Sequence, residues 1–90
     1  MSSIPVVSVV IPAYNASFWL EETIRSVLDQ SFCHFEIIVV DDGSTDNTRE
    51  VVTHFDDVRI QYVWQPNRGL SGARNTGIRK SRGRYVALLD

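Results

Sequence analysis

Phe35-Glu36-Ile37-Ile38-Val39-Val40-Asp41-Asp42-Gly43 is the stretch that decides the fold of this 90-residue chain. Its apolar residues are rich in β-branched types and end at a turn signal, which predicts a strand that is covered on both faces. Two carboxylates follow at the carboxyl end of that strand, where open α/β sheets bind their ligands. The stretch therefore predicts a buried strand and a candidate binding site together.

The same layout occurs earlier in VVSVVIPAYN, residues 6–15. There the predicted strand ends on an aromatic ring, Tyr14, and an amide, Asn15, instead of two acids. An aromatic plate and a carboxylate at neighbouring strand ends suit a flat heterocycle that has a hydrogen-bond donor on its edge. A nucleobase fits that description.

Helix-like segments follow both strands. The first carries apolar residues at helical spacing, with Asn15 or Ser17 as its expected N-cap. These apolar residues are Phe18, Trp19, Thr23, Ile24, Val27 and Leu28. A second helix is expected through residues 48–55, capped by one of residues 44–46 and closed by the acidic pair Asp56-Asp57.

The rest of the chain continues this alternation. Residues 58–64 alternate apolar and polar side chains, which is typical of a strand near a sheet edge. A third helix is expected over about 70–81, and residues 85–89 read as another buried strand that ends on Asp90. Four strands joined by three right-handed helical crossovers predict an α/β fold with a doubly wound, mainly parallel sheet. Because a bare apolar edge strand pairs with other chains, we expect the 90-residue chain to self-associate through its last strand.

Composition indicates a globular chain of at most one domain, with 43% hydrophobic and 22% charged residues. The net charge of −2 divides into −7 over residues 1–67 and +5 over residues 68–90. The basic part is short and helix-like, so it does not indicate a nucleic-acid partner. It is either a solvated helix surface or a source of attraction for a diphosphate.

Cysteine and histidine indicate no catalytic or metal site. The single Cys33 cannot form an internal disulfide, and neither it nor His34 and His54 has partners at the spacing of a metal site or a nucleophile. The start of the chain lacks a signal-peptide pattern, and no run approaches the roughly 20 apolar residues of a membrane helix. These features predict a cytoplasmic location, and membrane association of a longer protein stays open as the alternative.

Three other phosphate-binding and phosphate-transfer classes do not fit. Nicotinamide-dinucleotide binding needs glycines in the first strand-to-helix turn, and residues 12–16 contain none. The chain has no P-loop, and the spacing of residues 41–45 is wrong for an aspartyl phosphatase. The glycines at 69, 72 and 77 match no phosphate fingerprint and are expected to permit tight turns.

Five ordered blocks of this sequence resemble the opening of family 2 glycosyltransferases. They are VVIPAYN at 9–15, SVLDQSF at 26–32, EIIVVDDGSTD at 36–46, NRG at 67–69 with ARNTGI at 73–78, and GRYVALLD at 83–90. The resemblance covers nearly the whole chain from Val7 onward. It implies an A-type nucleotide-sugar fold, with residues 1–90 as the nucleotide-binding half.

The resemblance also implies roles for the strand ends. Tyr14 would stack on the base, usually uracil, and Asp42 would accept the imide N–H of that base. Asp41 would orient the loop or touch the ribose, while Pro12 and Asn15 would shape the turn around the base. The alternatives are that Tyr14 only packs the strand end and that both acids only cap the second helix.

The remaining implied roles concern the diphosphate. Gly43 would permit the backbone reversal after the second strand, and Arg74 would lie near the diphosphate unless it is a plain surface arginine. Asp90 resembles the first residue of the family's D-x-D element, which binds Mg²⁺ or Mn²⁺ with the diphosphate. The second carboxylate of that element would be residue 92, and the family's general base would lie farther downstream.

The sequence therefore predicts part of an inverting glycosyltransferase that uses a nucleotide-diphosphate sugar, most often a UDP-sugar. Its acceptor would be a carbohydrate or a lipid-linked hydroxyl, and the isolated 90 residues would be inactive. Two alternatives stay open: a non-catalytic nucleotide-binding or interaction module with the same half-fold, and a nucleotidyltransferase. The second would normally carry a glycine-rich basic loop after the first strand, which is absent here.

Overall fold

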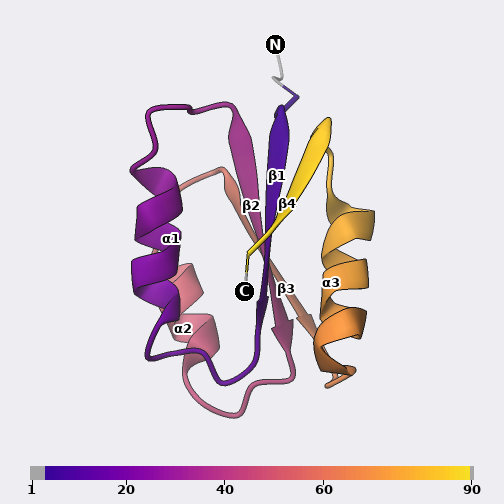
Figure 1. Ribbon diagram of the computed structural model, residues 1–90. Coiled ribbons are helices and arrows are strands. Elements are labelled where there is room, and N and C mark those ends of the chain that lie inside the picture. Colours follow the sequence, from indigo (N-terminus) through magenta and orange to yellow (C-terminus); the bar gives the residue numbers. More distant parts are fainter. Residues whose placement is uncertain (1–3, 90) are drawn as a thin grey trace.

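The computed structural model describes residues 4–89, which form one parallel sheet with helices on both faces (Figure 1). The sheet has four strands in the order β3-β2-β1-β4, and every neighbouring pair is parallel. The elements are β1 (Val7–Ala13), α1 (Leu20–Leu28), β2 (Phe35–Asp42), α2 (Thr48–Thr53), β3 (Ile60–Gln65), α3 (Gly69–Lys80) and β4 (Tyr85–Leu88). The predicted doubly wound α/β class is confirmed.

The core has two layers because the two faces of the sheet are covered separately. In Figure 1, α1 and α2 lie on one side of the sheet and α3 lies on the other. Alternate residues of β2 point to opposite faces, so Ile37 and Val39 join the cluster under α1 and α2, while Ile38 and Val40 pack with Ala73 of α3. All eight residues of β2 are buried, which confirms the prediction of a strand covered on both faces.

Helix α3 lies unusually close to the sheet at Gly77. A Cβ atom at this position would come within 2.2 Å of Val10 Cγ1 on β1. The absence of a side chain therefore allows α3 to rest directly on the strand. This close approach holds the second half of α3 against the middle of β1.

The predicted start of the first helix is wrong. Helix α1 begins at Leu20, no side chain caps it, and Phe18 is 86% exposed. The Asn15 side chain is engaged elsewhere, because its Oδ1 accepts hydrogen bonds from the backbone N–H of Thr45 at 2.8 Å and of Asp46 at 3.3 Å. A residue predicted to be a helix cap instead joins two loops.

The second helix is shorter than predicted and ends at Thr53. Of the three candidate caps, Asp46 is the one that bonds its first turn, since its Oδ1 accepts from the Thr48 N–H at 3.0 Å. The acidic pair does not close the helix. Asp57 instead binds Arg59, through the Arg59 N–H at 2.9 Å and the guanidinium at 2.8 Å.

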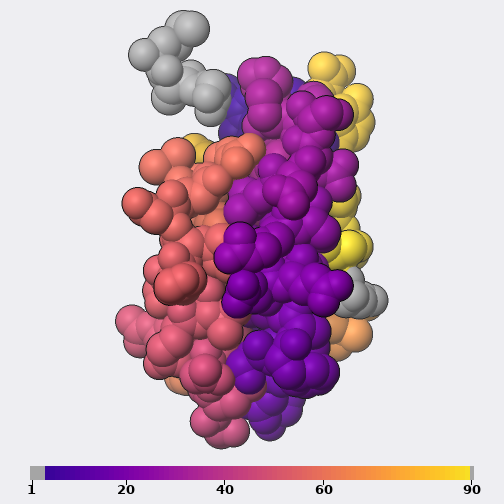
Figure 2. All heavy atoms as spheres, turned by 90° about the vertical axis from the view of Figure 1, so that its left-hand side faces the viewer, coloured from indigo at the N-terminus to yellow at the C-terminus, as the bar shows by residue number. Residues whose placement is uncertain are grey.

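The outer strands differ from each other in how well they were predicted. β3 lies at one edge of the sheet, as its alternating pattern indicates. The prediction of a buried last strand is wrong for the described residues, since all four residues of β4 are exposed. β4 pairs with β1 along one side, and its other side faces no strand within residues 4–89. In Figure 2, β4 is visible along the rim of the face, beyond the atoms of α1.

Candidate functional site

A crevice of about 180 Å³ opens at the carboxyl ends of β1 and β2. The end of β1, the end of β2, the loop after β3 and the first turns of α3 contribute its walls. It is lined by Pro12, Ala13, Tyr14, Asp42, Asn67, Gly69, Leu70 and Ala73. Tyr14 and Asp42 thus line the same crevice, as expected for the ends of adjacent parallel strands.

Tyr14 supplies an accessible aromatic surface at the rim of this crevice. Its side chain is 54% exposed, whereas the preceding residue, Ala13, is 2% exposed. The chain reverses immediately afterwards at Asn15, whose φ of 48° lies in the left-handed region. The turn therefore holds the tyrosine where its ring can meet a ligand.

Asp42 is almost completely buried, at 3% exposure, and its carboxylate anchors the loop between β3 and α3. Oδ1 accepts from Gln65 Nε2 at 2.9 Å and from the Arg68 N–H at 2.8 Å. Oδ2 accepts from the Gly69 N–H at 2.9 Å. Hydrogen bonds to a carboxylate are stronger than those between neutral groups, so Asp42 fixes one wall of the crevice that it also lines.

Asp41 faces the opposite side of the sheet from Asp42, because successive strand residues alternate. Its carboxylate accepts from the Ser44 N–H at 2.9 Å and from the Tyr62 hydroxyl at 2.5 Å. Burial and this hydrogen bond raise the pKa of Tyr62 above its ordinary value. Asp41 is not among the residues that line the crevice, and its contacts are those of a residue that orients the loop.

Asn15 and Gly43 join the loops that follow β1 and β2. The Asn15 N–H donates to Ser44 Oγ at 2.8 Å, and its side chain receives the hydrogen bonds from Thr45 and Asp46 described above. Gly43 has φ of 78°, and a Cβ there would lie 2.8 Å from the Asn67 backbone nitrogen. Both residues shape the turns around the crevice, and Gly43 permits the backbone reversal predicted for it.

Two predicted residues stand apart from this arrangement. Arg74 belongs to α3 and follows Ala73, but it is not among the residues that line the crevice. Asp90 lies outside the described residues, so its role as a metal ligand stays a prediction. Residues 4–89 contain no group of three or more His, Cys, Asp or Glu side chains placed to hold a metal ion.

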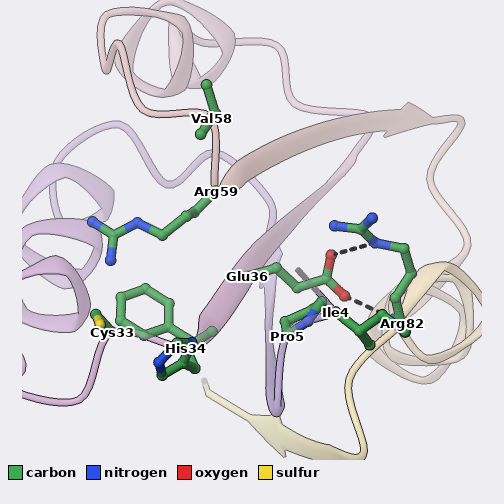
Figure 3. A pocket seen from close by; sticks show the side chains of 9 residues that line it. Ile4, Pro5, Cys33, His34, Glu36, Val58, Arg59 and Arg82 are labelled. Atoms are coloured by element: carbon green, nitrogen blue, oxygen red, sulfur yellow. Dashed lines mark hydrogen bonds and ion pairs between the residues drawn. The ribbon is translucent and has the colours of Figure 1, made fainter. Parts of the chain in front are cut away.

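A second pocket, of about 200 Å³, lies at the opposite end of the sheet, beside the amino ends of the strands (Figure 3). Its charged side chains already bind protein groups. Glu36 accepts from Ser8 Oγ at 2.6 Å and from the Arg82 N–H at 2.7 Å, and Arg59 pairs with Asp57. Burial opposes ionisation of Glu36, but these hydrogen bonds outweigh it and lower its pKa. These contacts connect β1, β2 and the segment before β4, which is a structural role.

The sequence interpretation missed part of the crevice. Asn67, Gly69, Leu70 and Ala73 all line it, whereas the sequence predicts only a tight turn at Gly69. Asn67 Nδ2 also donates to the Asp42 carbonyl at 3.1 Å. The signal that could have located this wall is position: residues 67–73 follow the carboxyl end of the strand next to β2, so they must cross the same edge of the sheet.

Among the described residues, no helix combines the length and apolar character needed to cross a membrane.

The model of the family described as "Glycosyl transferase family 2" matches residues 8–90. TuaG of Bacillus subtilis (strain 168), whose name assigns it to teichuronic acid biosynthesis as a glycosyltransferase, is 48% identical over 89 residues, which cover 96% of this chain and 35% of TuaG. WfgD of Escherichia coli, named UDP-Glc:alpha-D-GlcNAc-diphosphoundecaprenol beta-1,3-glucosyltransferase, is 42% identical over 85 residues, or 93% of this chain and 34% of WfgD.

Solved structures show the same arrangement of strands and helices. The structure of S. aureus TarS residues 1–349 superimposes with a TM-score of 0.88 at 30% identity, over 93% of this chain and 26% of that 1–349 chain. TarS has also been solved in complex with UDP. Mannosyltransferase PcManGT from Pyrobaculum calidifontis, solved with GDP-Man and Mn²⁺, gives a TM-score of 0.77 at 30% identity, over 87% of this chain and 25% of PcManGT. The chain thus spans about a third or less of the length of these relatives, and over that length it belongs to glycosyl transferase family 2.

Proposed function

We propose that this chain is the nucleotide-binding part of an inverting glycosyltransferase that transfers a sugar from a UDP-sugar to an acceptor hydroxyl. The observation that supports this proposal best is that Tyr14 and Asp42 line one crevice at the carboxyl ends of adjacent parallel strands. The relatives add to this support, because WfgD is named for a UDP-glucose donor and TarS has been solved with UDP.

In this proposal the crevice holds the base of the donor. The half-exposed ring of Tyr14 stacks on the flat face of uracil, and the Asp42 carboxylate accepts the imide N–H. Pro12, Asn15 and Gly43 keep the two loops in place around the base. Asp41 acts through the loop that it orients.

The diphosphate lies toward the basic segment of the chain, where Arg74 contributes positive charge. Asp90 would contribute a carboxylate ligand to Mg²⁺ or Mn²⁺, and the bound ion would supply positive charge that stabilises the leaving diphosphate. The Mn²⁺ in the structure of PcManGT is consistent with this assignment.

Residues 1–90 form the nucleotide-binding half in this proposal, and further residues of a longer protein supply the general base and the acceptor site. A carbohydrate or a lipid-linked sugar is the proposed acceptor, in keeping with the diphosphoundecaprenol acceptor in the name of WfgD. The 90-residue chain alone is then expected to bind nucleotide weakly and to transfer no sugar.

Tyr14 gives the sharpest test, because its exposed side chain can be changed with little effect on folding. In a longer protein that contains this chain, Tyr14→Ala should weaken UDP binding by about 1–3 kcal/mol, the usual scale of base stacking on an aromatic ring. Tyr14→Phe keeps the ring and should bind UDP nearly as well as the wild type. Phe18→Ala removes a neighbouring exposed ring outside the crevice and is the matched control. Isothermal titration calorimetry that gives the same UDP affinity for Tyr14→Ala and the wild type would contradict the proposal.

A further inference from the structure

We propose that Gln65 and Thr76 are positioning residues that set the preference of the crevice for uracil, by fixing the Asp42 carboxylate as a hydrogen-bond acceptor. This inference rests on the proposed function, in which Asp42 contacts the base. Neither residue lines the crevice, so both act through Asp42.

Three elements meet in a buried chain of hydrogen bonds. Gln65, the last residue of β3, is 6% exposed and donates from Nε2 to Asp42 Oδ1 at 2.9 Å. Thr76, in α3, is 7% exposed and donates from its hydroxyl to Gln65 Oε1 at 2.6 Å. Arg79 Nη2 in turn donates to Thr76 Oγ1 at 3.1 Å. The chain of donors thus runs from α3 through β3 to the carboxylate at the end of β2.

The direction of this chain follows from the chemistry of its ends. An ionised carboxylate only accepts, so the Gln65 amide must turn its NH₂ group toward Asp42. Its carbonyl oxygen must then face Thr76, whose hydroxyl has a single proton to donate. That proton goes to Gln65 rather than to the Gly72 carbonyl, since the first contact is 2.6 Å and the second 3.1 Å. Thr76 therefore determines which way the amide points.

The hydrogen bonds to Asp42 also limit what a ligand can use. A carboxylate offers about four acceptor positions. Gln65, Arg68 and Gly69 take three of them, which leaves about one for a base. Uracil presents one imide N–H between two carbonyls and matches a single acceptor position. Guanine presents two adjacent donors, and cytosine presents an acceptor at the same ring position, so both fit less well.

The fold alone does not choose the base, which is why these contacts matter. TarS has been solved with UDP and PcManGT with GDP-Man, although this chain superimposes on both. Without the Thr76 hydroxyl, the Gln65 carbonyl oxygen loses its donor and the amide can rotate. Asp42 would then lose a fixed hydrogen bond, and its carboxylate would be less restricted to one acceptor position.

The test compares Thr76→Val with Thr76→Ser in a longer protein that contains this chain. Valine has nearly the shape of threonine without the hydroxyl, and serine keeps the hydroxyl. Isothermal titration calorimetry measures the affinities for UDP and CDP. We expect Thr76→Val to reduce the preference for UDP over CDP by about three- to tenfold, the fold-change that corresponds to about one hydrogen bond, whereas Thr76→Ser should retain it. Gln65→Met should reduce the same ratio and serves as the second variant if Thr76→Val does not fold.

The ratio of the UDP affinity to the CDP affinity distinguishes a positioning role of Gln65 and Thr76 from a purely structural one. If Thr76 and Gln65 only stabilise the domain, their variants weaken UDP and CDP equally, and an unchanged ratio overturns this inference. The proposed function fails in a different way, because the wild type would then bind UDP and CDP with equal affinity. A wild type that prefers UDP, together with variants that keep that preference, would leave the proposed function intact and remove only Gln65 and Thr76 from it.

Discussion

Replacing Asp42 by alanine should destabilise the fold as well as weaken nucleotide binding. Its carboxylate accepts three hydrogen bonds, and the side chain is 3% exposed. A buried donor that loses its partner costs about 1–3 kcal/mol, so three donors set an upper limit of about 9 kcal/mol. Arg68 and Gly69 are exposed at the start of α3, where water can replace the carboxylate, which reduces the expected loss to about 3–5 kcal/mol.

Thermal and urea unfolding of the 90-residue chain, followed by circular dichroism, would measure this loss. At about 4–8 °C per kcal/mol for a domain of this size, Tm should fall by more than about 12 °C. Asp56→Ala is the matched control, because it makes the same chemical change at an exposed position and should stay within about 0.5 kcal/mol of the wild type. If Asp42→Ala were as stable as Asp56→Ala, the three hydrogen bonds would not hold the loop, and our account of the crevice wall would be wrong.

Two further predictions concern acid stability and association. Burial opposes ionisation of Asp46, but hydrogen bonds from Thr48 and Ser17 outweigh it and lower its pKa from 3.8 to about 2. The ionised Asp46 carboxylate therefore stabilises the fold above about pH 4, and this stabilisation is lost as the pH falls toward about 2. In urea unfolding measured over this pH range, Asp46→Asn should reduce the pH-dependent change in the free energy of unfolding by about 1 kcal/mol. A variant with the same pH dependence as the wild type would contradict this prediction. The exposed side chains of β4 include Val86 and Leu88, at 41% and 48% exposure, and the 90-residue chain should associate through this strand. In sedimentation velocity, the double variant Val86→Lys, Leu88→Lys should contain more monomer than the wild type. A wild type that stays monomeric at high concentration would rule this association out.

The buried strand and the meeting of Tyr14 with Asp42 were predictable from sequence because both follow from local rules. A β-branched run bounded by a turn indicates a strand covered on both faces, and the carboxyl ends of parallel strands lie at the same edge of a sheet. The identity of the two residues then follows from reading each strand to its end.

The helix boundaries and the last strand were not predictable in the same way. Asn15 has the chemistry of a helix cap, but in the fold its side chain binds Thr45 and Asp46, which are 30 and 31 residues away in the sequence. The apolar composition of residues 85–88 is the same whether β4 is central or at an edge, so composition could not reveal its exposure. The role of the Asn15 side chain and the exposure of β4 both depend on which residues distant in the sequence lie beside them in the fold.

Gln65 was missed for a related reason. The alternating pattern predicts a strand that ends at residue 64 and a loop from Gln65 onward, and nothing local marks this polar residue as buried. Its burial depends on two partners, Asp42 and Thr76, that lie 23 positions before it and 11 after it. Only the fold brings these three residues together.

The two adjacent acids show why binding and stability must be measured together in this crevice. Because successive residues of a strand alternate, Asp41 and Asp42 point to opposite faces of the sheet, and each carboxylate accepts a hydrogen bond from the loop on its own side. A loss of nucleotide affinity on replacing Asp42 therefore combines a lost contact to the base with a loosened wall. Tyr14 is half exposed at the rim, so its replacement changes the ligand contact with little effect on the walls. The affinities of both variants must therefore be compared at equal fractions of folded protein, so that a loss of stability in Asp42→Ala is not counted as a lost contact to the base.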